Sequence, residues 1–120
     1  MKALSIRQPY AALVALGRKP LEIRSRPTAY RGEFYVHAGR TPDRAALARL
    51  GGAVPVGALV IHGAVIARAR LVACRPYAPE DAPLAHAPYR PGLWAWVLAD
   101  ARLVEPFAAV GRLGFFEVPA

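Results

Sequence analysis

The sequence contains a single cysteine, no asparagine and no apolar run long enough to cross a membrane. Because Cys74 has no partner in the chain, an internal disulfide is excluded, and a lone thiol fits a reducing cytoplasm. The longest apolar stretch, residues 58–67, is interrupted by His62 and Gly63, so we interpret it as a strand rather than a membrane span. The N-terminus lacks the basic-then-apolar pattern of a signal peptide. We therefore expect a cytoplasmic protein with no membrane partner.

Several catalytic and metal-binding patterns are also missing. The three histidines lie far apart, and none stands at ligand spacing from Cys74, so no metal site is predicted. Ser5 and Ser25 are the only serines, and neither lies in a Gly-x-Ser-x-Gly motif. The chain has no glycine-rich phosphate loop. We predict that it uses no metal and no other cofactor.

Positive charge is abundant. Lys and Arg number 16 against 8 Asp and Glu, which gives a net charge of +8, and all but two of the cations are arginine. This excess favours an anionic partner, above all RNA or another nucleic acid. A coding bias toward arginine is an alternative explanation, and the scarcity of thermolabile residues hints at a heat-adapted, thermostable protein. The length of 120 residues predicts one domain, residues 1–120, and we favour a monomer.

The pattern of elements predicts a mainly β fold with short helices (α+β), arranged as a small, mostly antiparallel β-barrel. Helices are expected after Pro9, ending at Gly17, and after Thr41, ending at Gly51. A proline-rich irregular segment is expected over residues 75–92, where it is typical of a binding loop or lid. Strands are expected at residues 2–6, 21–25, 33–38, 56–72 with a bulge, bend or turn at Gly63, 93–98, 102–104 and 113–118.

The segment from Gly17 to Arg26 holds the strongest candidate site. Alternation along a strand places Glu22, Arg24 and Arg26 on one face, and Lys19 in the preceding turn can reach the mouth of the same cleft. Three charges on one face must meet solvent or a polar cleft. A solvated face with a structural ion pair and a cleft in which Lys19 and Glu22 exchange protons are both compatible with this spacing.

Aromatic residues near arginines form a second candidate feature: Tyr10, Tyr30, Tyr35, Trp94 and Trp96. Such residues can stack on nucleic-acid bases, although tryptophan on a strand also commonly packs in a core. Trp94 and Trp96 share one strand face, so we expect them to be buried or exposed together. Arg68 and Arg70 share a face of another strand and are expected to be exposed.

Three motifs together resemble the ASCH (activating signal cointegrator homology) domain family. They are LSIRQPYAALV at residues 4–14, GxKxxExR at residues 17–24, and TxYRG at residues 28–32. YVHAG at residues 35–39, WxWVL at residues 94–98 and GxLGFF at residues 111–116 extend the similarity over nearly the whole chain. The resemblance implies a PUA-like fold, which is a small β-barrel flanked by two or three helices, with a cleft beside the barrel for RNA or another nucleic acid.

The charge, the arginine-lined strand face and the resemblance together predict a set of nucleic-acid-binding residues. They are Gln8, Tyr10, Lys19, Arg24, Arg26, Thr28, Tyr30, Arg31, Arg68, Arg70 and Trp94. The alternative is a small hydrolase, either a ribonuclease or an acetylcytidine amidohydrolase, with Lys19 and Glu22 as catalytic residues. The amidohydrolase branch of the family pairs the lysine with a threonine and a later glutamate. Here the threonine position falls on Glu22, and the later strand offers Arg68 and Arg70, which argues against that mechanism.

Overall fold

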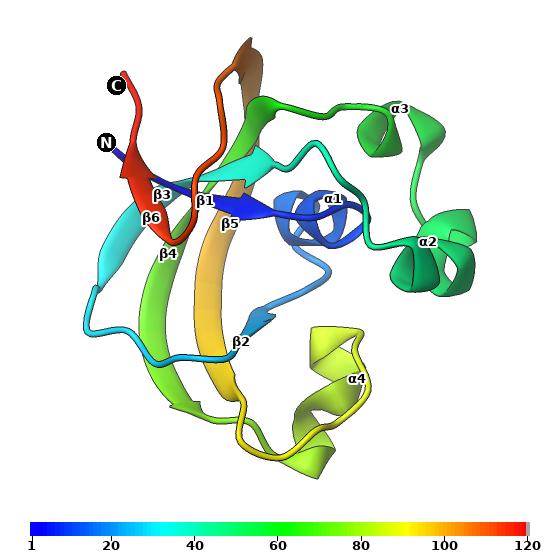
Figure 1. Ribbon diagram of the computed structural model, residues 1–120, viewed down its shortest axis with the longest axis vertical. Coiled ribbons are helices and arrows are strands. Elements are labelled where there is room, and N and C mark those ends of the chain that lie inside the picture. The colour runs from blue at the N-terminus through cyan, green and yellow to red at the C-terminus, as the bar shows by residue number, and fades with distance from the viewer. Residues whose placement is uncertain (120) are drawn as a thin grey trace.

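The computed structural model describes residues 1–119 as one curved sheet with short helices on its concave side (Figure 1). The strands are β1 (Lys2–Ile6), β2 (Leu21–Arg24), β3 (Gly32–Ala38), β4 (Ala64–Pro76), β5 (Trp94–Ala108) and β6 (Phe115–Glu117). The helices are α1 (Tyr10–Ala15), α2 (Arg44–Leu50), α3 (Val56–Leu59) and α4 (Ala82–Ala85), with 3₁₀ turns η1 (Gly51–Ala53) and η2 (Pro79–Asp81).

The six strands are ordered β2-β5-β4-β3-β1-β6. Only β1 and β3 run parallel, and the other neighbours are antiparallel. The predicted fold class, mainly β with short helices, is therefore confirmed. The sheet is not closed into a complete barrel, because β2 and β6 stand at its two edges in the described residues.

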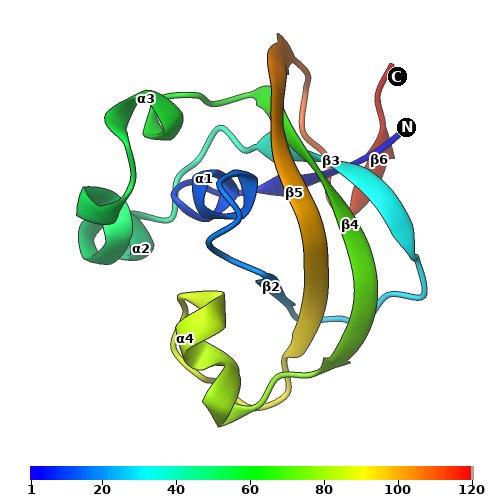
Figure 2. The same ribbon diagram turned by 180° about the vertical axis from the view of Figure 1, so that it is seen from behind.

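The sheet curves because β4 and β5 are long and their pairing is irregular. Their register shifts at three places, and β3 carries a further shift at Val36/His37. Each such bulge bends a strand and increases its twist. Figure 2 shows the result, in which β4 and β5 bend around the short helix α1.

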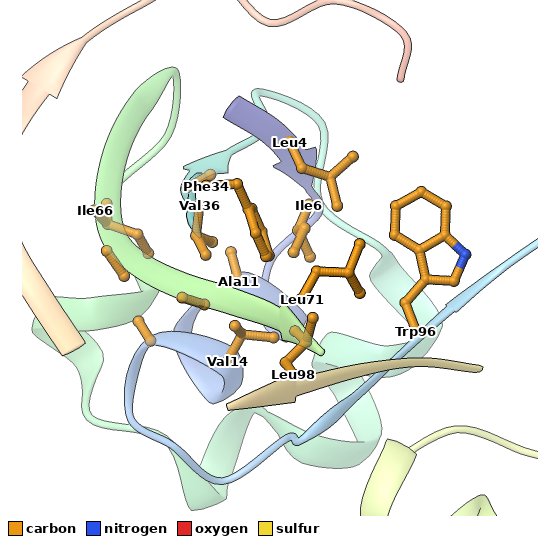
Figure 3. Close-up of a cluster of buried hydrophobic side chains, with 14 residues drawn as sticks. Leu4, Ile6, Ala11, Val14, Phe34, Val36, Ile66, Leu71, Trp96 and Leu98 are labelled. Carbon is orange, nitrogen blue, oxygen red and sulfur yellow. The ribbon is translucent and has the colours of Figure 1, made fainter. Parts of the chain in front are cut away.

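The core lies between α1 and the concave face of the sheet. Every residue of α1 after Tyr10 is buried, so this helix is apolar on all sides, as expected for one enclosed by a sheet. Ala11 and Val14 pack with Phe34, Leu71 and other strand residues in the largest apolar cluster (Figure 3). Gly17 ends the turn with φ of +74°, a conformation that glycine adopts without strain. The chain therefore reverses here and enters β2.

The prediction of a strand over residues 56–72 is wrong in its first part. Residues Val56–Leu59 form α3, and β4 begins only at Ala64, after a turn in which Gly63 has φ of +69°. Ala58 and Leu59 pack on the far side of α1 against Leu13, away from any strand that could pair with them. The apolar run therefore serves two packing sites, which composition alone does not distinguish.

The strands predicted at residues 93–98 and 102–104 are one continuous strand, β5. The irregular segment predicted over 75–92 is shorter than expected, because β4 extends to Pro76 and the remainder holds η2 and α4. Arg75 pairs with Asp81 at 2.6 Å, and Asp81 also accepts the backbone N–H of Ala78. These contacts fold the segment against the sheet, so α4 lies beside β2 (Figure 1).

Candidate functional site

A cavity that we call the main pocket has a volume of about 620 Å³ and is lined by Lys19, Glu22 and Arg24 of the segment 17–26. Six separate segments line it: the end of β1, the start of α1, the turn and strand around β2, Asp43 before α2, residues 87–93 after α4, and residues 112–114 before β6. The volume lies in the usual range for small-molecule sites. Its lining includes five cations (Arg7, Lys19, Arg24, Arg90 and Arg112) and two carboxylates (Glu22 and Asp43).

Glu22 is buried in the wall of this pocket and lies between two cations. Its carboxylate oxygens are 3.6 Å from Lys19 Nζ and 3.1 Å from Arg24 Nε. Glu22 is only 6% exposed, so it would be costly to bury without these partners. The alternation of β2 thus brings Glu22 and Arg24 to the same cavity, as the strand pattern predicted.

Lys19 lies deeper than the sequence indicated, since it is 2% exposed rather than at the cleft mouth. Its ammonium group donates to the carbonyl oxygens of Leu21 at 2.5 Å and Ala85 at 2.7 Å. It also lies 4.9 Å from the centre of the Tyr10 ring. Burial lowers the pKa of Lys19, and the neighbouring Glu22 carboxylate partly opposes this effect. Lys19 therefore ties α4 to β2 and fixes the position of Glu22.

Arg24 and Tyr10 complete the inner part of the pocket. Arg24 donates from Nη2 to the carbonyl of Ser5 at 2.9 Å, and its guanidinium lies 5.7 Å from the centre of the Trp96 ring. Tyr10 accepts a hydrogen bond from Arg49 Nη2 at 3.1 Å, and burial raises the pKa of its hydroxyl. These contacts hold both side chains in fixed positions along the wall.

The outer part of the pocket carries three arginines that the sequence analysis did not single out. Arg7, Arg90 and Arg112 are exposed, and none has an ion pair or a side-chain hydrogen bond within residues 1–119. Asp43 also lines the pocket, but its carboxylate caps α2 by accepting the N–H of Ala46 at 3.0 Å. The mouth of the pocket is thus positively charged.

The remaining predicted residues lie outside this pocket. Gln8 is fully buried, and its amide accepts from Ala12 N–H and donates to the carbonyls of Ala58 and Ile61. It therefore joins α1 to α3. Arg26, Thr28, Tyr30 and Arg31 belong to the loop between β2 and β3, where their contacts are mostly with that loop and with β3.

Arg68 and Arg70 lie on the convex face of the sheet, away from the main pocket. Arg68 pairs with Glu33 at 2.9 Å, and Arg70 lies near both Glu33 and Asp100. Arg70 is exposed, as predicted, whereas Arg68 is only partly exposed, at 33%. Trp94 and Trp96 both pack against the main core cluster, Trp96 as a buried residue and Trp94 as a partly buried one.

Sequence reasoning missed Arg7, Arg90 and Arg112 because each comes from a segment without regular alternation. Arg7 follows β1, Arg90 lies in the proline-rich segment, and Arg112 lies in the turn before β6. Arg7 lies within the motif at residues 4–14, and Arg112 occupies the unspecified second position of GxLGFF at residues 111–116, so the motifs could have pointed to both. Nothing in the local sequence separates Arg90 from the remaining arginines.

Within residues 1–119, no three His, Cys, Asp or Glu side chains come together in a way that could hold a metal ion. None of the helices in this part of the chain is both long enough and apolar enough to span a bilayer.

The curved mixed sheet, the enclosed helix α1 and the lateral cationic pocket together define a small α+β domain of the PUA-like type. Residues 4–108 match the family model of the ASCH domain, and the chain belongs to this family. The crystal structure of ASCH from Zymomonas mobilis is similar, with a TM-score of 0.62 and 18% identity over 89% of this chain and 72% of that one. A point mutant of that protein aligns with a TM-score of 0.61, 18% identity, and 89% and 74% coverage. No curated protein matches the chain.

Proposed function

We propose that this domain binds single-stranded RNA and takes one unstacked base into the main pocket. Membership of the ASCH family supports nucleic acid as the ligand. The observation that carries the proposal is a pocket of about 620 Å³ with five cations around its lining and a buried carboxylate in its wall. Such a cavity suits a splayed base, whereas the bases of a duplex remain stacked and paired.

The cations at the mouth would hold the backbone, and Glu22 would read the base. Arg7, Arg90 and Arg112 are exposed there and have no carboxylate partner in the described residues. A carboxylate accepts hydrogen bonds but donates none. Glu22 therefore favours a base edge that carries an amino group, such as cytosine or adenine, over uracil.

Titration with labelled homopolymers of about eight nucleotides tests the proposal. Oligo(C) and oligo(A) should bind more tightly than oligo(U), and all three should weaken between 50 and 200 mM salt as counterions are released. A duplex of the same length should bind more weakly. Glu22→Gln, which adds a donor, should reduce the preference for C and A. Absence of binding, or affinity that is independent of salt, would contradict the proposal.

A second candidate is acid–base hydrolysis of RNA or of a modified nucleoside by Lys19 and Glu22. The lowered pKa of Lys19 favours it, because proton exchange is easier when the pKa lies nearer neutrality. The three ammonium protons already face two carbonyl oxygens and the Glu22 carboxylate, so catalysis would have to break one of these contacts. Incubation of RNA and acetylcytidine with wild type and Glu22→Gln distinguishes the two functions. Equal product in both samples would exclude this role.

A further inference from the structure

A second cavity of about 400 Å³ adjoins the main pocket. The two share Ser5, Arg7, Arg112 and Leu113 in their linings, so they form two lobes of one cleft. The second lobe also contains Arg40, Thr41 and the buried His37. Unlike the main pocket, its lining includes no carboxylate. Three arginines therefore meet in a concave site with no anion of the described chain to neutralise them.

The arginines of this cleft are unusual within the molecule. Eight of the fourteen arginines make a side-chain hydrogen bond or ion pair in the described residues: Arg18, Arg24, Arg31, Arg49, Arg68, Arg70, Arg75 and Arg102. The arginines without such a contact in residues 1–119 are Arg7, Arg26, Arg40, Arg44, Arg90 and Arg112. Four of these six line one lobe or both. Unpaired guanidinium groups are thus concentrated at the cleft.

The wall of the second lobe is held rigidly. His37 Nε2 lies 2.7 Å from the carbonyl of Ala109, which only accepts, so this nitrogen carries the proton. His37 Nδ1 then accepts from the hydroxyl of Ser5 at 3.1 Å. A Cβ at Gly111 would lie 2.9 Å from His37 Cε1, so any other residue here would displace the His37 ring or the backbone. This close approach fixes the backbone immediately before Arg112 and sets that arginine at the boundary of the lobes.

We propose that the second lobe is a phosphate subsite and that the cleft as a whole recognises a nucleotide. The base would occupy the main pocket beside Glu22, and the phosphate of the same nucleotide would lie between Arg7, Arg40 and Arg112. Guanidinium groups match phosphate oxygens in a bidentate geometry and remain charged at any physiological pH. This inference rests on the proposed function, because it specifies which part of an RNA ligand each lobe holds.

An NMR titration of the ¹⁵N-labelled protein separates the two lobes. The probes are cytidine, cytidine 5′-monophosphate, cytidine 3′-monophosphate and inorganic phosphate. Cytidine should shift amide signals around Glu22 and Arg24 only. At least one of the nucleotides should in addition shift the amides of Arg40 and Gly111, and should bind about tenfold more tightly than cytidine. Comparison of the 5′- and 3′-monophosphates shows which phosphate of the nucleotide, 5′ or 3′, occupies the subsite.

Substitution then assigns the phosphate contact. Arg40→Gln should reduce the advantage of the nucleotide over cytidine by at least about threefold. The matched control is Arg44→Gln, because Arg44 is an exposed arginine on α2 with no partner in the described residues and lies in neither lining. It removes the same charge and should leave the advantage unchanged. The amide spectrum of each variant verifies that it is folded.

Three results would overturn the inference. Equal affinity for cytidine and both nucleotides would leave a base pocket without a phosphate subsite, and the proposed RNA binding would still stand. Inorganic phosphate that binds as tightly as the nucleotides would indicate a simple anion site. An equal effect of Arg40→Gln and Arg44→Gln would indicate a response to net charge alone. If the protein binds the nucleotides but not oligo(C), the proposed RNA binding is contradicted, whereas the phosphate subsite still stands.

Discussion

In two regions of this domain, arginines lie around a single glutamate. The regions differ in whether all of their arginines have a carboxylate partner. On the convex face of the sheet, Glu33 lies within 4 Å of Arg68, Arg70 and Arg102, and its side chain is 36% exposed. In the main pocket, Glu22 is nearly buried between Lys19 and Arg24. Beyond this inner group, the pocket has further arginines without partners in residues 1–119, whereas Asp100 also pairs on the convex face.

Clustered arginines alone therefore do not identify a binding surface. A cation that already has a carboxylate partner must give up that contact, or share it, to bind an anion. Cations that line a concave site without a carboxylate partner can bind an anion without losing such a contact. We therefore propose that the ligand binds in the cleft rather than on the convex face, and the variants below probe each of these regions and the segment beside the pocket.

The largest expected effect is on stability. Glu22→Ala would leave the buried ammonium of Lys19 without its carboxylate, and removal of one partner from a buried pair costs about 3–5 kcal/mol. Glu33→Ala removes the carboxylate of exposed ion pairs, and such pairs typically stabilise a protein by about 1 kcal/mol or less. Urea unfolding of both variants measures the difference. If the two variants lose the same stability, the pocket carboxylate is not buried with its partners as described.

The next effect is on RNA affinity. Arg24→Gln should weaken binding of oligo(C) by about tenfold, because it removes a charge from the wall of the pocket and loosens Glu22. Arg70→Gln removes an equal charge from the convex face and should change affinity by less than about threefold. Fluorescence anisotropy at 50 mM salt compares them. A larger loss for Arg70→Gln would move the interface to the convex face, as the sequence prediction of Arg68 and Arg70 allows.

The sequence was sufficient to predict much of the fold and the charged residues in the inner part of the main pocket. Alternation in β2 brought Glu22 and Arg24 to one side, and the motif placed Lys19 near them. The same reasoning could not separate Arg24 from Arg70, because both are arginines on strand faces. What separates them is the origin of the carboxylate partner: Glu22 lies on the same strand as Arg24, whereas Glu33 of β3 reaches Arg70 from a neighbouring strand. Such cross-strand neighbours depend on register, which the chain's own spacing does not reveal.

The limits of the strand predictions have a similar cause. An apolar run does not reveal what it packs against or whether it is buried. Residues Val56–Leu59 were predicted as strand, although they form α3 and Val56 is 74% exposed. The arginines of the cleft mouth lie in segments without periodicity. Their positions depend on long-range contacts such as those of Gly111 with His37.

A smaller effect concerns the segment that supplies one wall of the pocket. The hydrogen-bonded guanidinium of Arg75 lowers the pKa of Asp81, so the contribution of this pair to stability is present above the ordinary pKa of an aspartate. It should disappear as the pH falls through the lowered value. Asp81→Asn should therefore cost about 1 kcal/mol at pH 7 and much less in strong acid. Thermal unfolding of both proteins between pH 7 and 2 measures this, and a cost independent of pH would contradict it.

The smallest expected effect comes from making the convex face resemble the cleft. Glu33→Gln would leave Arg68, Arg70 and Arg102 with one carboxylate, Asp100, among them. Affinity for oligo(C) at 50 mM salt should rise by about twofold, because the newly unpaired cations attract phosphate. Glu105→Gln is the control, since Glu105 is exposed and has no ion pair in the described residues. Equal gains in the two variants would show that net charge, rather than the release of paired arginines, governs nonspecific binding on this face. A gain much above twofold for Glu33→Gln alone would show that pairing with Glu33 is all that keeps this face from competing with the cleft.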